Sequence, residues 1–204
     1  MGQEWRILHV FADTGVECEV LSGYGDVTRL GIDPEPNPYT DRLVEADARD
    51  AADHLSGTFD LGLLHPPCQT WTPGARMNGT TDDHPNLIPL ARSIAREYCD
   101  EWIIENVPDA TLHNPTVLNG GMFRLPLHYE RAFETSHHVP APPRQASLSR
   151  PNDSFGDHHA TGGWHGSKEL WKSVKGYSHD WPGGPLKRSA VPRMYLNYLL
   201  RPLL

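Results

Sequence analysis

The chain has 204 residues, with 18 Lys and Arg against 26 Asp and Glu and a formal net charge of −8. This length suits one domain with its own apolar core and leaves little room for two. Because no apolar run approaches the roughly 18 residues of a membrane span, and because the first residues lack the regions of a signal peptide, we expect a cytoplasmic protein with no membrane partner.

Strand-like and helical patterns alternate through the first half of the chain. Short apolar runs predict strands, and apolar residues at spacings of three and four predict helices. In chain order these are a strand at 6–11, a helix at 16–23, a strand at 28–33, a helix at 48–55, a strand at 58–64, a helix at 87–98 and a strand at 102–105. Such alternation is typical of an α/β fold with a mostly parallel sheet.

The second half of the chain has a looser pattern. We expect a loop at 110–121, a strand at 128–135, irregular structure or a small inserted module at 136–185, and a closing helix at 191–203. The predicted domain organisation is a core at 1–135, a small insertion or target-recognition segment at 136–185, and a C-terminal helix at 186–204 that completes the core.

Charge is divided unevenly along the chain. Residues 1–120 hold 7 basic and 20 acidic side chains, whereas residues 121–204 hold 11 and 6, together with seven of the twelve histidines. A basic C-terminal part that also carries aromatic rings is suited to contacts with nucleic-acid phosphates and bases. The alternative, uneven surface charge without a function, stays open at this point.

Metal and disulfide chemistry have little support in the sequence. The three cysteines, Cys18, Cys68 and Cys99, show no CxxC spacing, which argues against a disulfide framework or a cysteine zinc site. Paired histidines at 137–138 and 158–159 can bind zinc, but no cysteine pattern accompanies them. We therefore predict no metal site and assign Cys99, in a helical stretch, to packing.

Two of the predicted strands end in reactive side chains. Cys68 follows the strand at 58–64, and Glu105 ends the strand at 102–105. Ligands of α/β folds bind at the carboxyl ends of the strands, where Gly15 and Asp33 are also expected. A thiolate that attacks C6 of cytosine makes C5 nucleophilic, and a neighbouring carboxyl group can bind N3 and relieve the ring charge. A cysteine taken alone is more often a buried small hydrophobe.

The motifs around these residues resemble those of a known family. Pro66-Pro67-Cys68-Gln69 resembles the catalytic motif of the DNA cytosine-5 methyltransferases, particularly the short virus and prophage forms, and Glu105-Asn106-Val107 resembles their cytosine-binding motif. The resemblance runs over about 6–135 and resumes near 186. It implies a Rossmann-like S-adenosylmethionine-dependent methyltransferase fold, a minimal target-recognition segment, cytosine-containing duplex DNA as the partner, and a monomer that takes part in DNA methylation or restriction-modification.

The resemblance also assigns roles to single residues. Cys68 would attack C6, Glu105 would bind the N3 edge, and Asn106 would hold the catalytic loop. Arg131 matches the second arginine of the family's Arg-x-Arg segment, which contacts the cytosine carbonyl oxygen, although a salt bridge to Glu130 or Glu134 is an alternative role. Tyr129 replaces the first arginine. The substrate-binding set also includes Pro67, Gln69 and Val107.

The cofactor implied by the resemblance is S-adenosylmethionine. Asp33 matches the acid that accepts hydrogen bonds from the ribose hydroxyls, and Asp47 matches the acid near the adenine amine. The remaining residues of the implied cofactor site are Phe11, Asp13, Thr14, Gly15, Pro34, Ala48, Pro66, Ser189 and Val191.

Two positions depart from the family pattern. Asp13 replaces the first glycine of Phe-x-Gly-x-Gly, and its carboxylate would repel that of the cofactor unless it turns away or pairs with the ammonium group. A working but altered pocket, another cofactor and a weakened enzyme all stay open. Ser189 stands in place of the Asn of the C-terminal Asn-Ala-Val-Pro signature and has a shorter reach.

The function implied is transfer of a methyl group to C5 of cytosine in DNA through a Cys68–C6 adduct. Because a paired base is out of reach, the family flips its target base, and the polar stretch 70–83 resembles the loop that closes over it. Three alternatives stay open: C5 modification of a free cytosine nucleotide, use of a modified cofactor, and a catalytically weak nucleic-acid-binding remnant.

Overall fold

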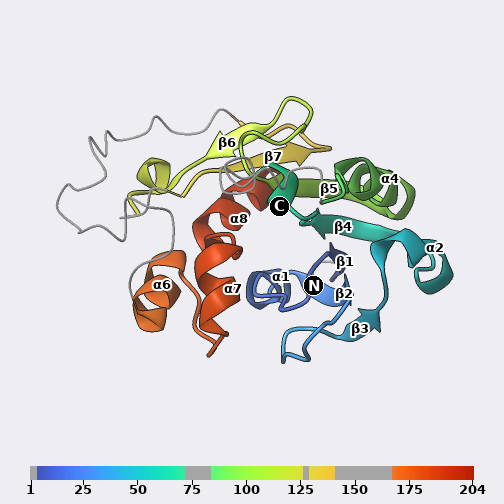
Figure 1. Ribbon diagram of the computed structural model, residues 1–204, viewed down its shortest axis with the longest axis horizontal. Coiled ribbons are helices and arrows are strands. Elements are labelled where there is room, and N and C mark those ends of the chain that lie inside the picture. The colour runs from blue at the N-terminus through green and yellow to red at the C-terminus, as the bar shows by residue number, and fades with distance from the viewer. Residues whose placement is uncertain (1–3, 72–83, 126–128, 141–166) are drawn as a thin grey trace. The chain divides into compact units, whose positions relative to one another are not determined.

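A computed structural model describes residues 4–71, 84–125, 129–140 and 167–204 (Figure 1). The chain forms two compact units, of which the first comprises Met1–Pro115 and Ala132–His137 and the second comprises Thr116–Arg131 and His138–Leu204. No helix in the described ranges has both the length and the apolar character needed to cross a membrane.

The first unit is an alternating α/β structure. Its elements are β1 (Trp5–Val10), α1 (Cys18–Leu21), β2 (Gly25–Gly31), β3 (Arg42–Glu45), α2 (Ala51–His54), β4 (Phe59–Leu64), α4 (Ile88–Tyr98), β5 (Cys99–Asn106) and β7 (Arg131–Thr135). The seven-stranded sheet has the order β3-β2-β1-β4-β5-β7-β6. The first five strands in that order pair in parallel, and β7 pairs with β5 in the antiparallel sense.

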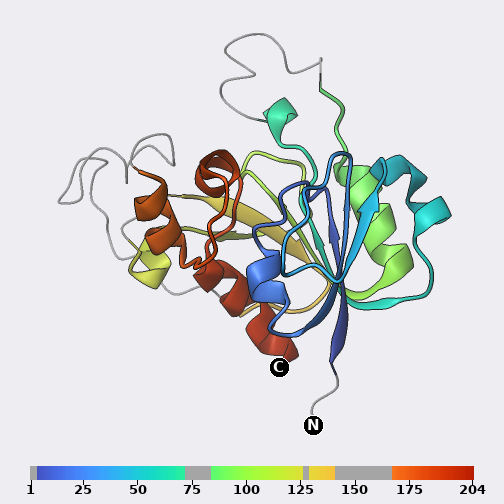
Figure 2. The same ribbon diagram turned by 90° about the horizontal axis from the view of Figure 1, so that it is seen from below.

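The register of the parallel strands aligns their carboxyl ends. His9 pairs with Leu63 of β4 and with Arg29 of β2, and Leu64 pairs with Ile104 of β5. Because successive side chains of a strand point to opposite faces, residues paired in this way share a face. Figure 2 shows α1 against one face of these strands and α2 and α4 against the other.

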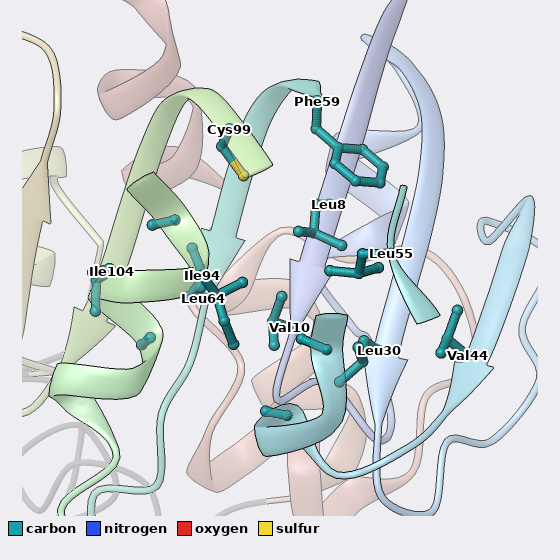
Figure 3. Packing of buried hydrophobic residues seen from close by; sticks show 14 residues of the cluster. Leu8, Val10, Leu30, Val44, Leu55, Phe59, Leu64, Ile94, Cys99 and Ile104 are labelled. Atoms are coloured by element: carbon teal, nitrogen blue, oxygen red, sulfur yellow. The ribbon is translucent and has the colours of Figure 1, made fainter. Parts of the chain in front are cut away.

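The face under α2 and α4 is apolar. Figure 3 shows the buried residues packed there, which come from every parallel strand and from both helices. They include Leu8, Val10, Leu30, Val44, Leu55, Phe59, Leu64, Ile94, Cys99 and Ile104. Cys99 lies within this core, where its Sγ fills the space that a side chain on Gly62 would need, at 2.5 Å from the position of a Cβ atom. The assignment of Cys99 to packing is therefore confirmed.

The described part of the second unit contains a short strand and several helices. These are β6 (Thr116–Leu118), α6 (Lys168–Lys175), α7 (Gly183–Arg188) and α8 (Arg193–Leu200). Tyr195 of α8 donates a hydrogen bond to the carbonyl of Tyr129 at 2.8 Å, and its ring lies 5.1 Å from that of Phe123. Lys175 is buried and donates to the carbonyls of Lys187 and Ala190. These contacts join the helices of the unit.

The predicted α/β fold with a mostly parallel sheet is confirmed, while several elements differ from expectation. The strand β3 was not predicted, and the loop expected at 110–121 is wrong at β6, because short strands without clear alternation give no periodic signal. The irregular structure expected at 136–185 is wrong at α6. Ser167 caps the start of α6 by accepting from the N–H of Leu170 at 3.2 Å, and Gly176, at φ 80°, ends it.

Candidate functional site

The two strand ends singled out in the sequence lie side by side in the sheet. Cys68 follows β4, and Glu105 is the penultimate residue of the neighbouring strand β5. Leu64 and Ile104 are paired partners, so the chain segments that follow them leave the sheet at the same edge. This arrangement puts a thiol-bearing turn and a carboxyl group at the carboxyl ends of two neighbouring strands.

Asn106 ties these two segments together. Its side chain is buried and donates from Nδ2 to the carbonyl of Pro66 at 2.9 Å, while its Oδ1 accepts the N–H of Val107 at 2.9 Å. Pro66 and Pro67 contribute no backbone N–H and have fixed φ angles. The turn that carries Cys68 is thereby held against β5 by one buried side chain.

His65 contacts the carboxyl group of Glu105 directly. The distance from His65 Nδ1 to Glu105 Oε2 is 2.9 Å, and the two side chains are only 14% and 9% exposed. The ring of His9 meets that of His65 edge to face, with 5.1 Å between centroids. Burial, followed by the proximity of His65 and Arg29, lowers the pKa of His9 well below its ordinary value, so His9 is neutral at physiological pH.

Two buried groups extend this polar cluster. Cys18 Sγ lies 3.3 Å from His9 Nδ1, and Glu17 Oε2 lies 4.0 Å from His9 Nε2. One potential ligand atom from each of His9, Glu17 and His65 lies within 4.8 Å of the others. Imidazole and carboxylate groups suit zinc, so among the residues that the structure describes these three form a set that is suited to hold a metal ion.

The three cysteines occupy different environments. Cys18 and Cys99 are buried, and burial raises the pKa of each thiol to about 12. Cys68 is partly exposed. Since the thiolate is the nucleophilic form, Cys18 and Cys99 are unreactive at neutral pH, and Cys68 is the thiol that a substrate can reach.

The side chain of Asp13 accepts hydrogen bonds from the backbone just after β2. Its Oδ1 accepts the N–H of Ile32 at 2.9 Å and that of Asp33 at 3.2 Å. A Cβ added to Gly31 would lie 2.4 Å from the same oxygen, so the side chain of Asp13 fills the space that the glycine leaves. The carboxylate at the position of the family glycine thus stabilises the turn that presents Asp33.

Arg29 holds the loop that precedes α1. This buried side chain donates from Nη1 to the carbonyl of Thr14 at 2.5 Å and from Nη2 to the carbonyl of Glu35. Gly15 adopts φ 64° and lies so close that an added Cβ would meet Arg29 Nη1 at 2.4 Å. Glycine is therefore needed at position 15 for both its conformation and its size.

The other residues of the implied cofactor site surround these loops. Phe11 follows β1 at φ 59°, and Pro34 is half-buried beside the exposed Asp33. Asp47 caps a 3-10 helix by accepting from the N–H of Arg49 at 2.9 Å, and Ala48 is buried behind it. Asp33 is consequently an exposed acid at the end of β2, whereas both oxygens of Asp47 are engaged by Arg49, Oδ1 by its N–H and Oδ2 by its guanidinium at 3.3 Å.

Arg131 belongs to the second unit and is held there by Tyr129. Arg131 Nη2 donates to Tyr129 Oη at 2.5 Å and to the carbonyl of Arg188 at 3.0 Å, and its guanidinium lies 3.9 Å from the centre of the Tyr129 ring. Tyr129 is buried, and its hydroxyl donates to the carbonyl of Arg188 at 2.8 Å. The tyrosine that replaces the family's first arginine thus supports the second.

Ser189 and Val191 also belong to the second unit. Ser189 Oγ donates to the carbonyl of Pro185 at 3.1 Å, so its hydroxyl completes the end of α7. Val191 is buried, and its carbonyl accepts from the hydroxyl of Tyr177 at 2.5 Å.

Gln69, in the first unit, is exposed directly after Cys68.

Parts of the expected site lie outside the described residues. These are residues 72–83 of the expected closing loop and the histidine pair at 158–159. At the edges of that loop, Thr70 donates from Oγ1 to the carbonyl of His84 at 3.0 Å. His137 belongs to the first unit, and its Nδ1 lies 3.6 Å from a carboxylate oxygen of Glu101.

Three residues that shape these sites had no predicted role: His65, Arg29 and Tyr129. His65 stands directly before Pro66, at the carboxyl end of a strand, and a polar residue at that position was a usable signal. Arg29 lies inside an apolar strand, where a charged residue requires a buried partner. Glu105 lies 40 residues from His65, and Thr14 lies 15 residues from Arg29, so these contacts follow only from the fold.

Neither a protein-family model nor a curated protein matches the sequence. Among solved structures, the chain is similar to the methyltransferase EhMeth of Entamoeba histolytica, with a TM-score of 0.57, 10% identity and 100% of each chain covered. It also matches the glycopeptide N-methyltransferase MtfA, solved with S-adenosyl-L-homocysteine, with a TM-score of 0.33, 16% identity, and coverage of 68% of this chain and 60% of that one. The sheet order and the likeness to EhMeth show that the chain has the Rossmann-like fold of S-adenosylmethionine-dependent methyltransferases.

Proposed function

We propose that the protein transfers a methyl group from S-adenosylmethionine to C5 of cytosine in DNA. The observation that carries this proposal is the pairing of two strand ends: the partly exposed Cys68 after β4 and the buried Glu105 on β5, joined by the hydrogen bond from Asn106 to Pro66. A nucleophilic thiol and a carboxyl group at one sheet edge suit covalent addition to a pyrimidine ring.

Cys68 performs the addition in this proposal. Its thiolate forms a bond to C6, and the electron pair of the C5–C6 double bond moves toward C4, which makes C5 the nucleophilic carbon. After C5 has been methylated, a base removes the C5 proton and the bond from sulfur to C6 breaks. Pro66 and Pro67 restrict the backbone before Cys68, and Asn106 holds the carbonyl of Pro66, so less chain entropy is lost when the thiolate attacks.

Glu105 stabilises the ring during this addition. Addition to C6 also shifts an electron pair from the N3–C4 double bond onto N3, and the carboxyl group of Glu105 donates a proton there. Glu105 is buried, and in such surroundings a hydrogen bond to a developing charge is worth more than in water. By the resemblance, Arg131, which Tyr129 holds, has the role of contacting the cytosine carbonyl oxygen.

The first unit contains residues that fit the cofactor. The exposed carboxylate of Asp33 can accept both ribose hydroxyls, and one oxygen of Asp13 already accepts two backbone N–H groups. This hydrogen bonding directs the Asp13 carboxylate toward the end of β2 and supports the working-pocket interpretation over repulsion of the cofactor. When bound, S-adenosylmethionine supplies the electrophilic methyl group.

Duplex DNA is the proposed substrate, with the cytosine flipped out of the helix. Basic and aromatic residues of the second unit, including Lys168, Lys172 and Arg193, offer contacts to phosphates. A free cytosine nucleotide would need only the strand-end site. The two substrates are therefore distinguished by a direct assay.

The test measures transfer of tritium from labelled S-adenosylmethionine to duplex DNA, single-stranded DNA and dCMP in parallel. We expect duplex DNA to be labelled and Cys68→Ser to abolish labelling, because a hydroxyl is a far weaker nucleophile than a thiolate at neutral pH. Cys99→Ser, in the apolar core, is a control for general loss of a cysteine. Labelling by Cys68→Ser at the wild-type rate would exclude the mechanism, and labelling of dCMP alone would reassign the substrate.

Covalent trapping identifies the reacting atom. Duplex DNA containing 5-fluorocytosine should remain attached to Cys68 after methyl transfer, because fluorine at C5 cannot leave as a proton. Mass spectrometry of the tryptic peptides locates the attachment. Attachment at another residue, or none in the presence of the methyl donor, would contradict the role of Cys68. Binding of S-adenosylhomocysteine, followed by calorimetry, tests the cofactor separately.

A further inference from the structure

We propose that His65 is the positioning residue for Glu105, an inference that rests on the proposed function. His65 Nδ1–H donates to Oε2 of Glu105, which fixes the orientation in which the carboxyl group meets the N3 edge of cytosine. The same hydrogen bond stabilises the carboxylate that forms when Glu105 gives its proton to N3. His65 acts through Glu105 and does not touch the base.

The geometry follows from the sheet. Leu64 and Ile104 are paired across β4 and β5, so His65 and Glu105, one residue further along each chain, lie opposite each other and on the same face. The distance between His65 Nδ1 and Glu105 Oε2 is 2.9 Å. The terminal torsion of a glutamate is broad and roughly twofold, and a fixed donor on one oxygen removes that freedom.

The surroundings of His65 favour a donor that stays in place. His9 of β1 meets its ring edge to face, and Glu17 before α1 lies within the same cluster. Cys18 of α1 lies 3.3 Å from His9, and the charged groups of the described residues that lie near His9 include Glu17 and Arg29, one of each sign.

The proton balance of the step is closed. As the bond from Cys68 sulfur to C6 forms, the electron pair displaced from the N3–C4 double bond takes the proton of Glu105. The resulting carboxylate keeps its hydrogen bond from His65 Nδ1–H, which is worth more to a charged acceptor than to a neutral one. When sulfur leaves C6, the N3 proton returns to Glu105. His65 neither gains nor loses a proton.

The first experiment compares His65→Ala, His65→Asn and His54→Asn in the DNA methylation assay. His65→Ala should lower kcat about 10- to 100-fold, the value of a lost hydrogen bond to a charged group, while KM for DNA and the circular dichroism spectrum stay unchanged. The amide of Asn can donate from nearly the position of Nδ1, so His65→Asn should recover most of kcat. His54 ends α2, is exposed, and controls for the His→Asn change itself.

Wild-type kcat in His65→Ala would overturn the proposal, and so would equal loss in His65→Asn and His65→Ala, because the donor would then be irrelevant. Chelation by EDTA should leave activity intact. Loss of activity that zinc restores would also overturn it, since His65 would then act as a metal ligand together with His9 and Glu17.

A second experiment does not depend on catalysis. Nitrogen-15 NMR of the free protein should show a protonated Nδ1 on His65, identified by its absence in His65→Asn, and this resonance should shift in Glu105→Gln. An unprotonated Nδ1 would refute the hydrogen bond as stated. If wild-type protein methylates no cytosine substrate while NMR shows the bonded pair, the proposed function fails and the pair itself stands.

Discussion

The two faces of the parallel sheet in the first unit are built for different purposes. The face under α2 and α4 carries Leu8, Leu30 and Ile104, all buried in one apolar cluster. On the same strands the opposite face carries His9, Arg29 and Glu105, which are also buried. These three side chains form polar contacts with Cys18, with the carbonyl of Thr14 and with His65, respectively. Adjacent residues of one strand therefore have different roles: Leu8 packs in the apolar core, and His9 belongs to the polar cluster next to the candidate site.

The polar face has a cost that the apolar face does not. A buried charge or imidazole loses its hydration and must regain hydrogen bonds from the protein. Here the partners are the thiol of Cys18 in α1, the imidazole of His65 and the backbone carbonyls of Thr14 and Glu35, which lie in or next to the loops of the candidate site. The polar face thus fixes these loops, and substitutions on the two faces should separate activity from stability.

The largest effect is expected for Glu105→Gln, on the polar face. The amide keeps the size of the side chain but cannot donate a carboxyl proton to N3, so kcat for DNA methylation should fall on the order of 10²- to 10³-fold. The melting temperature should change little, because Gln can still accept from His65. Full activity in this variant would remove Glu105 from the chemistry and with it the contrast between the faces.

The opposite result is expected for Leu8→Ala, on the apolar face. Leu8 is fully buried, and truncation of such a side chain leaves a cavity that costs about 3 kcal/mol of unfolding free energy. Urea denaturation measures this loss. The activity per folded molecule should stay at the wild-type value, and a parallel fall in kcat at low temperature would show that the faces are coupled.

The apolar face was easier to predict from the sequence than the polar face, and particular residues show why. Leu8, Leu30 and Ile104 belong to apolar runs, so their strands and the parallel sheet were predictable from periodicity. Cys68 and Glu105 were predictable as strand-end residues, and the resemblance gave them roles. The contact from His65 to Glu105 joins residues 40 apart in sequence, and the bonds of Asp13 to the turn after β2 join residues 19 and 20 apart. Only the register of the sheet brings such pairs together.

A smaller effect is expected for Glu134→Gln, on the strand β7 that pairs with β5. Glu134 of β7 is buried and accepts from Arg92 through both carboxylate oxygens at 2.7 Å, and from the N–H of His113 at 2.8 Å. Burial alone would raise the pKa of Glu134, but the hydrogen bonds from Arg92 and His113 outweigh it and lower the pKa below its ordinary value of 4.5. The charge-assisted bonds contribute about 2 kcal/mol.

This contribution has a definite pH dependence. Because the folded-state pKa of Glu134 is depressed, the stabilisation is present above pH 4.5 and is lost as pH falls through the folded-state pKa. Urea denaturation between pH 7 and pH 3 should therefore show a shallower loss of stability in Glu134→Gln than in wild type. Identical slopes would mean that Glu134 does not titrate differently in the folded protein.

The smallest effect is expected for Asp13→Asn, which tests how far the polar face extends into the cofactor site. Asn keeps an oxygen that can accept from the N–H groups of Ile32 and Asp33 and removes only the charge. If the carboxylate is engaged by the turn, binding of S-adenosylhomocysteine should change by less than about threefold, or roughly 0.7 kcal/mol. Asp13→Gly, which restores the family residue, removes the acceptor and should weaken binding more than Asp13→Asn, because the turn that presents Asp33 loses two hydrogen bonds. Tighter binding by both variants would instead show that the Asp13 charge repels the cofactor, and the stabilising role assigned to this carboxylate would be wrong.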